Sequence, residues 1–233
     1  MINLNFSNYT KICQSKIPEL DNLIRGKKLD EAIKESQQFI DELKFILNER
    51  IWSEASEIDY NNILILAITF KAFKDYAELG KITVKKEWEL NNSNLETVWT
   101  KLWDCRDRLD YVKDNSESSI IGDIYKNLDR LLGEYKKHFG DGLYASPEIL
   151  IKKEHCSICK ADIRACNHIK GYGYSGVICY GIPQDFEMTT VSLVEVPKDP
   201  RCRMWPWRRK EKMVFEMAIL TMFQIDDFLK DEV

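Results

Sequence analysis

The chain has 233 residues, of which 44% are hydrophobic and 31% are charged. This length and apolar content are sufficient to bury a core, and they exclude an intrinsically disordered chain. With 34 Lys and Arg against 38 Asp and Glu, the net charge is -4, which argues against a protein that coats nucleic acid over its whole surface. Any nucleic-acid contact must therefore come from a local patch.

The first residues and the longest apolar run argue against export and against a membrane span. Residues 1–16 contain three Asn and lack the continuous apolar segment of a secretory signal. The longest purely apolar run, Ile63–Ile68, is far shorter than the roughly 20 residues that cross a bilayer. We therefore expect a cytoplasmic protein without a membrane partner.

Helical spacing of apolar residues dominates residues 7–139. The segments with the clearest spacing are 29–47, 62–79, 94–112 and 119–139. The second of these is the most apolar and is expected to end at Gly80 as a C-terminal cap, and the last should stop at Gly140. Four or five consecutive helices with short polar joints predict a helical bundle for residues 1–143.

The pattern changes in the second half of the chain. Residues 140–206 hold 6 of the 10 Gly and 5 of the 6 Pro, so long helices are disfavoured there. Short runs of residues that favour β-structure, such as Val191–Val196, predict strands, and we expect residues 144–207 to form a compact β-rich module. Helical spacing returns over 212–229, which predicts a C-terminal helix within 208–233 that packs on the bundle or on a partner. The expected fold is therefore α+β.

The strongest chemical signal is a group of Cys and His in residues 155–179. Seven cysteines are an odd number, and four of them lie in this stretch, which fits metal-bound thiolates in a reducing compartment better than a set of disulfides. Cys156 and Cys159 have the C-x2-C spacing of a zinc knuckle, in which a tight turn directs two thiolates at one ion. Cys166 and His168 supply two further ligands.

This set of three thiolates and one imidazole predicts tetrahedral Zn²⁺ as its occupant. Since four protein ligands leave no open position for a water molecule, the site is expected to be structural rather than catalytic. The ligand set leaves alternatives open, because Cys179 or His155 can take the place of His168. Buried reduced cysteines beside a hydrogen-bonded histidine are the alternative without a metal.

The cysteine-rich segment resembles a zinc-containing segment of bacterial and prophage proteins. The shared pattern is C-x2-C, C-x-H, G-x-x-Y-x-G and C, with its later members at Gly171, Tyr174, Gly176, Cys179 and Val191–Cys202. The similarity covers about residues 144–202 and does not extend to the helical half. It implies a bacterial protein in a mobile-element or phage-defence setting, and it implies no activity.

The same segment also resembles zinc-supported HNH nucleases, in which a histidine activates water beside a catalytic metal. This chain departs from that pattern, because Asn167 precedes His168 and His168 is itself needed for zinc. Neither a second C-x2-C pair nor a downstream pair of Asn and His follows.

A G-x-G-x-x-G pattern occupies Gly171, Gly173 and Gly176. In a dinucleotide-binding fold these glycines follow a strand and open a helix. Here they follow a predicted zinc ligand almost directly, so we expect them to form turns.

A basic and aromatic stretch over Lys198–Lys212 is the second candidate site. Seven Lys or Arg against two acidic residues give it a local charge of +5. Basic side chains neutralise phosphates and aromatic rings stack on unpaired bases, so the stretch is a candidate for binding nucleic acid or an acidic partner. Docking on the acidic bundle of the same chain, and tryptophans in the core, are the alternatives. The candidate contact residues are Arg201, Arg203, Trp205, Trp207, Arg208, Arg209 and Lys210.

The sequence contains no recognisable nucleophile with its base, P-loop or catalytic pair of carboxylates. We therefore expect a non-enzymatic, zinc-stabilised interaction or adaptor protein whose helical half binds a protein partner. A nucleic-acid-binding or HNH-like nuclease component is the alternative hypothesis.

Overall fold

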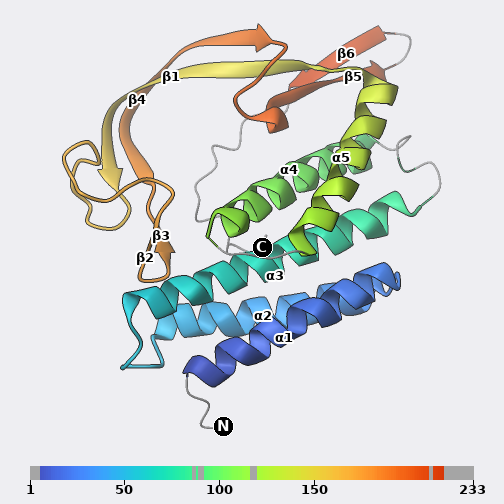
Figure 1. Cartoon of the computed structure of the whole chain (residues 1–233). Helices are drawn as coiled ribbons and strands as arrows, with labels where there is room; N and C mark the ends of the chain where they lie inside the picture. Colours follow the sequence, from blue (N-terminus) through green and yellow to red (C-terminus); the bar gives the residue numbers. More distant parts are fainter. Residues whose placement is uncertain (1–5, 86–87, 89–91, 116–119, 210–211, 218–233) are drawn as a thin grey trace. The chain divides into compact units, whose positions relative to one another are not determined.

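A computed structural model describes residues 6–85, 88, 92–115, 120–209 and 212–217 of the chain. Helices occupy the first part of these residues and antiparallel strands occupy the second (Figure 1), which confirms the α+β fold class. The helices are α1 (Phe6–Arg25), α2 (Leu29–Glu49), α3 (Glu57–Thr83), α4 (Asn92–Asn115) and α5 (Ile120–Phe139). The strands are β1 (Leu143–Cys156), β2 (Gly173–Tyr174), β3 (Val177–Ile178), β4 (Gly181–Val194), β5 (Arg203–Arg209) and β6 (Lys212–Met217).

The described chain divides into two compact units. The described residues of the first unit lie within 6–126 and 171–178, so it contains α1–α4 and the β2–β3 hairpin. The second unit contains residues 127–170 and 179–217, with most of α5 and the larger sheet. The boundary between the units falls inside α5, after Lys126, whereas the predicted boundary of the helical bundle lies after residue 143.

The first unit is built around α3, which packs against α2 and α4. Apolar side chains are buried along almost its whole length, as expected for a central helix. The helix begins earlier than predicted because Ser56 and Asp59 form a capping box, in which the Ser56 hydroxyl accepts a hydrogen bond from the backbone of Asp59. It also continues to Thr83, so the predicted cap at Gly80 is wrong. A Cβ on Gly80 would lie 3.3 Å from a methyl group of Leu29, which indicates that this glycine permits close packing of α2.

The G-x-G-x-x-G segment forms the small β2–β3 hairpin, which confirms the prediction of a turn. Ser175 and Gly176 at its tip both have positive φ, as a two-residue type I′ hairpin turn requires. The side chain of Asn61 on α3 donates to the carbonyl of Gly173 (3.0 Å) and accepts from the backbone N–H of Gly176 (2.8 Å). These two bonds hold the hairpin on the helical unit.

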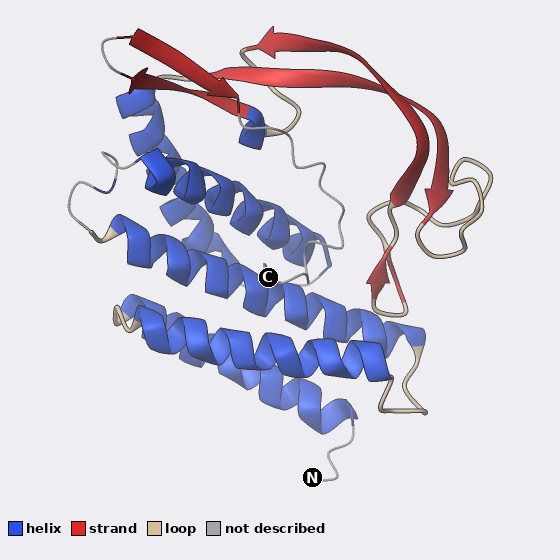
Figure 2. Cartoon of the chain, turned by 180° about the vertical axis from the view of Figure 1, so that it is seen from behind, coloured by secondary structure: helices blue, strands red, loops and turns tan. Residues whose placement is uncertain are grey.

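The sheet of the second unit has the strand order β4-β1-β5-β6. Strands β1 and β4, each 14 residues long, pair side by side along nearly their whole length (Figure 2), with register shifts near Glu148 and Lys153. Strand β5 pairs with only the first two residues of β1, so most of the β1–β4 pair is a two-stranded ribbon. Strand β1 was not predicted from the sequence, and the predicted strand Val191–Val196 overlaps only the end of β4.

The C-terminal helix predicted over 212–229 is wrong in its first part, because Lys212–Met217 form strand β6. Strand β6 pairs antiparallel with β5, and the pairs run from Arg209 with Lys212 to Met204 with Met217. Its backbone N–H and C=O groups are therefore satisfied by β5 and not by hydrogen bonds within a helix. Residues 218–233 lie outside the described part of the chain. Among the described helices, none is both long and apolar enough to span a bilayer.

Candidate metal centre

Strand β1 carries Cys156 to the end of the long ribbon, where it pairs with Gly181 of β4. Immediately after Cys156 the chain reverses in a tight turn, in which the backbone N–H of Lys160 donates to the carbonyl of Cys156 (2.9 Å). Lys160 itself has a positive φ of 62°. The backbone N–H of Ile158 points at the Cys156 sulfur at 3.4 Å. This is the knuckle geometry that the C-x2-C spacing predicts, and it places Cys159 beside Cys156.

A second turn supplies the other two candidate ligands. The Asp162 carboxylate accepts a hydrogen bond from the backbone N–H of Arg164 (2.9 Å), and the Asp162 carbonyl accepts one from the backbone N–H of Cys166 (3.1 Å). Asp162 therefore fixes the turn that presents Cys166, and His168 follows two residues later.

The ligand atoms of Cys156, Cys159, Cys166 and His168 all lie within 4.8 Å of one another. Sulfur ligands bound to a tetrahedral ion at about 2.3 Å lie about 3.8 Å apart, so the group needs only a small contraction to hold one ion. Cys156 is buried, Cys166 and His168 are half-buried, and Cys159 is exposed. The four residues predicted from the sequence can thus hold a metal ion at the end of the ribbon.

The electrostatics of the thiols are those of a cation site. Burial opposes ionisation of Cys156, but the backbone N–H groups of Cys159 and Ile158 outweigh it and lower the pKa of the Cys156 thiol. Burial and the neighbouring Cys156 raise the pKa of the Cys179 thiol. The Cys156 thiol therefore ionises readily, whereas a second thiolate next to it is opposed by repulsion between the two negative charges. A bound cation removes that repulsion.

Cys179 remains an alternative ligand. Its sulfur lies 3.7 Å from the sulfur of Cys156, a spacing typical of two ligands of one tetrahedral ion, and its side chain is fully buried. His155 pairs with Ile182 in the ribbon and forms a β-bridge with Asp162, and it is not one of the four clustered residues.

Sequence reasoning missed the residues that support these ligands. Ser157 forms two hydrogen bonds of 2.9 Å with Tyr180: its hydroxyl accepts from the Tyr180 N–H, and its own N–H donates to the Tyr180 carbonyl. These bonds connect the segment that carries Cys179 with the turn between Cys156 and Cys159. Glu154, two residues before Cys156, forms an ion pair with Lys170 (2.7 Å), two residues after His168. A serine between two cysteines has no distinctive sequence signal, because its partner lies 23 residues away.

The structure separates the members of the predicted basic contact stretch. Arg203 and Trp205 are buried in the second unit, so neither side chain is available to stack on or neutralise a ligand in this conformation. Arg201 is half-buried and forms an ion pair with Asp199 (2.9 Å). The backbones of Trp207, Arg208 and Arg209 lie in β5, their side chains are outside the described set, and Lys210 lies outside the described residues.

Arg203 has a structural position at the end of α5. Its guanidinium donates to the carbonyls of Phe139 and Gly140, each at 3.0 Å, and lies 5.0 Å from the ring centroid of Trp205. The carbonyls at a helix C-terminus carry partial negative charge, which compensates the buried cation. A Cβ on Gly142, whose φ is 93°, would lie 2.7 Å from the guanidinium carbon, so glycine is required there.

Substitution of this arginine is expected to destabilise the second unit. Arg203→Met removes the donors to two helix-end carbonyls, and we expect a loss of about 2–3 kcal/mol, since hydrogen bonds to charged groups contribute about 1.5–3 kcal/mol each. Urea unfolding followed by tryptophan fluorescence measures the change. The control is Lys198→Met at an exposed position nearby, for which we expect almost no change. A loss below 1 kcal/mol for Arg203→Met contradicts this role.

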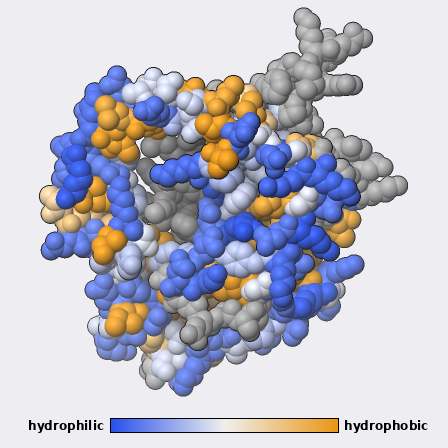
Figure 3. Space-filling model, turned by 45° about the horizontal axis from the view of Figure 1, so that its top comes forward, coloured by the Kyte–Doolittle hydropathy of each residue, from blue (hydrophilic) through white to orange (hydrophobic). Residues whose placement is uncertain are grey.

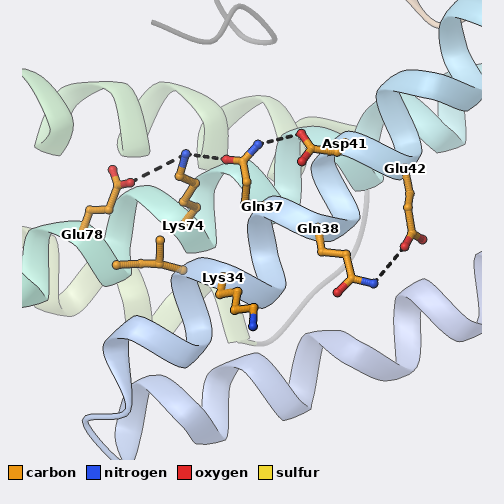
Figure 4. Close-up of a pocket in the computed structure, with 8 residues that line it drawn as sticks. Lys34, Gln37, Gln38, Asp41, Glu42, Lys74 and Glu78 are labelled. Carbon is orange, nitrogen blue, oxygen red and sulfur yellow. Dashed lines mark hydrogen bonds and ion pairs between the residues drawn. The ribbon is translucent and has the colours of Figure 1, made fainter.

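A depression of about 620 Å³, lined mainly by Lys, Gln, Asp and Glu residues, lies between α2 and α3 (Figure 4). Its side chains bind one another: Gln37 accepts from Lys74 at 2.5 Å and donates to Asp41 at 2.7 Å, and Gln38 donates to Glu42 at 3.0 Å. This network links two helices, and we assign no ligand to it.

Comparisons with protein-family models, with curated proteins and with solved structures gave no match. The resemblance to a zinc segment of bacterial and prophage proteins therefore has no support beyond the motif itself. What stands is a cluster of three cysteines and one histidine that can hold a metal ion.

Proposed function

We propose that the chain is a non-enzymatic protein-interaction or adaptor protein in which one zinc ion stabilises the end of an exposed β-ribbon. The observation that carries the proposal is the convergence of Cys156, Cys159, Cys166 and His168 at the point where β1 ends. Four protein ligands complete a tetrahedral shell, which is the arrangement of structural zinc sites.

Zinc is the ion that fits this donor set best. Thiolate and imidazole ligands favour Zn²⁺ over Mg²⁺ or Ca²⁺, which prefer oxygen. When bound, zinc supplies a charge that holds the thiolates together and thereby stabilises the fold. The protein residues hold their positions through the N–H groups of the knuckle and through the Ser157–Tyr180 bonds.

The shape of the second unit favours interaction over catalysis. Nearly all of β4 and the middle of β1 are exposed or half-exposed, so the ribbon presents a long surface rather than an enclosed site. A setting in bacterial mobile elements or phage defence is part of the proposal, and it rests only on the resemblance of residues 144–202. The nucleic-acid alternative is weakened by the burial of Arg203 and Trp205.

A partner-capture experiment tests the adaptor function. The full chain is compared with Cys159→Ser, which removes a ligand, and with Cys202→Ser, a cysteine outside the cluster. We expect a defined protein partner, identified by mass spectrometry, to bind the wild type and Cys202→Ser but not Cys159→Ser. Metal-dependent cleavage of DNA or RNA, or nucleic-acid binding whose affinity falls steeply with salt, contradicts the proposal.

A further inference from the structure

Between residues 145 and 151 of β1, the β1–β4 ribbon has one face made of apolar residues. Because side chains alternate between the two faces of a strand, the residues of every second cross-strand pair share a face. A register shift after Glu148 leaves Thr189 as an extra residue on β4, so Val191 and Met188 stay on the same face. The pairs on this face are Ala145–Leu193, Pro147–Val191, Ile149–Met188 and Ile151–Phe186. We call these eight residues the apolar ribbon face. It runs through four consecutive pairs without a charged side chain.

The apolar ribbon face lies opposite the side of the sheet that packs on α5. Tyr144 pairs with Arg203 in the sheet, and the Arg203 guanidinium lies over its ring, so both side chains are on the α5 side. Trp205, two residues after Arg203, contacts Tyr135 of α5 on that side with ring centroids 6.0 Å apart. Ala145 follows Tyr144 and therefore begins the opposite face.

Five of the eight residues of the apolar ribbon face are exposed, Pro147 and Ile149 are half-buried, and Ala145 is buried. Its exposed members range from 39% for Ile151 to 60% for Leu193, with Phe186 at 52% and Met188 at 59%. Figure 3 shows hydrophobic side chains exposed among hydrophilic ones on the side of the molecule that it brings forward. These side chains amount to roughly 450 Å² of apolar surface, as large as the largest patches on soluble monomers, which are often functional.

The other face of the ribbon is mixed in its middle part. It carries Ser146, Glu148 and Thr190 beside the exposed Leu150, and an ion pair joins Lys152 to Glu187 at 3.0 Å. Antiparallel sheets with one apolar and one polar face normally cover the apolar face. The ribbon is therefore patterned to be covered on the side away from α5.

We propose that the apolar ribbon face is a homodimer interface, covered by the same face of a second copy of this chain. An uncharged face must meet an uncharged surface, since a charge buried there would find no partner. The same face of a second copy is also uncharged and has the same length, and a two-fold axis can bring the two faces together. Sheets pack face to face in this way in β-sandwiches. A patch of roughly 450 Å² is a little over half of the about 800 Å² per partner that a standard interface buries, so the residues around it must supply the rest.

This inference goes beyond the proposed adaptor function, because self-association needs neither another protein nor zinc at the interface. The metal-binding cluster lies past the Ile151–Phe186 pair, at the end of the ribbon. A dimer would therefore carry two zinc-stabilised ends while leaving the opposite face of each ribbon accessible.

Sedimentation velocity of the full chain over a concentration series tests the interface. We expect the wild type to form a dimer, and Leu193→Glu and Met188→Glu to raise the dimer dissociation constant at least tenfold. The matched control is Ser192→Glu, which places the same charge one residue away on the opposite face and should leave the dissociation constant unchanged. A wild-type chain that is monomeric at all concentrations, or equal weakening by Ser192→Glu, overturns the proposal.

Two further measurements keep the result interpretable. Zinc content and far-UV circular dichroism are recorded for every variant, and Met188→Thr replaces Met188→Glu if the latter does not fold. A chain that becomes dimeric only after removal of residues 218–233 overturns the proposal, because its own C-terminal segment then covers the face. A monomeric wild type with normal zinc content contradicts only the interface, whereas absence of zinc from the wild type contradicts the proposed function.

Discussion

Replacement of Cys159 by Ser is expected to abolish stoichiometric zinc binding and to unfold the cysteine-rich end of the second unit. Changes in residues that only support zinc ligands already lower metal affinity about 10–100-fold, so removal of a ligand should lower it by at least about 100-fold. The effect on folding should be large, because structural zinc contributes about 10–16 kcal/mol in small zinc-dependent domains.

Elemental analysis and thermal melting of the full chain measure this effect. We expect one zinc per chain in the wild type and in Cys202→Ser, and a lower melting temperature for both after treatment with a chelator. Cys202 is a suitable control because it is a buried cysteine of the same unit whose sulfur contacts the Asp199 carbonyl instead of the cluster. A metal-free wild type whose melting temperature does not respond to chelation contradicts the zinc site.

The same measurement decides between the two candidate fourth ligands. If His168 is the ligand, His168→Ala loses zinc and Cys179→Ser retains it. If Cys179 binds the ion, the outcome is reversed, in agreement with its 3.7 Å distance from the Cys156 sulfur. Substitution of His155 should leave the zinc content unchanged, since His155 is outside the cluster.

Arg108→Met is expected to destabilise the helical unit by about 3–5 kcal/mol, the usual cost of removing one partner from a buried ion pair. Arg108 on α4 and Asp75 on α3 form an ion pair whose side chains are both almost fully buried. Burial raises the pKa of Asp75 despite the opposing charge of Arg108. Without Arg108, the Asp75 carboxylate is left with Lys71 at 3.7 Å as an ion-pair partner.

Urea unfolding of Arg108→Met and of the double variant Asp75→Leu/Arg108→Met tests this prediction. The double variant removes both buried charges, so it should recover most of the lost stability. Lys113→Met, at an exposed position of the same helix, is the control and should change stability by less than about 0.5 kcal/mol. Equal loss in the single and double variants indicates that packing, rather than the unpaired charge, sets the cost.

The helices and the metal ligands could be predicted because their signals are local. Helices α2, α4 and α5 follow from apolar residues that recur within one or two turns, and α5 ends before Gly140 as predicted. Cys156, Cys159, Cys166 and His168 lie within 13 consecutive residues of the sequence, and two short turns suffice to bring them together. Helix formation and the clustering of these ligands therefore depend on residues that are close in the sequence.

Residues far apart in the sequence decided the rest. Strand β1 was missed because it is defined by β4, about 40 residues later, and Lys212–Met217 became a strand because β5 offers it hydrogen bonds. The composition around Arg203 and Trp205 predicts contact residues, but both side chains are buried. Arg203 binds the carbonyl of Phe139 at the end of α5, and Trp205 packs against Tyr135. The helical periods and the donor atoms for a metal follow from short stretches of the chain. The pairing of the strands, the burial of particular cations and the exposure of one apolar face depend on distant partners, so they become defined only when the chain folds.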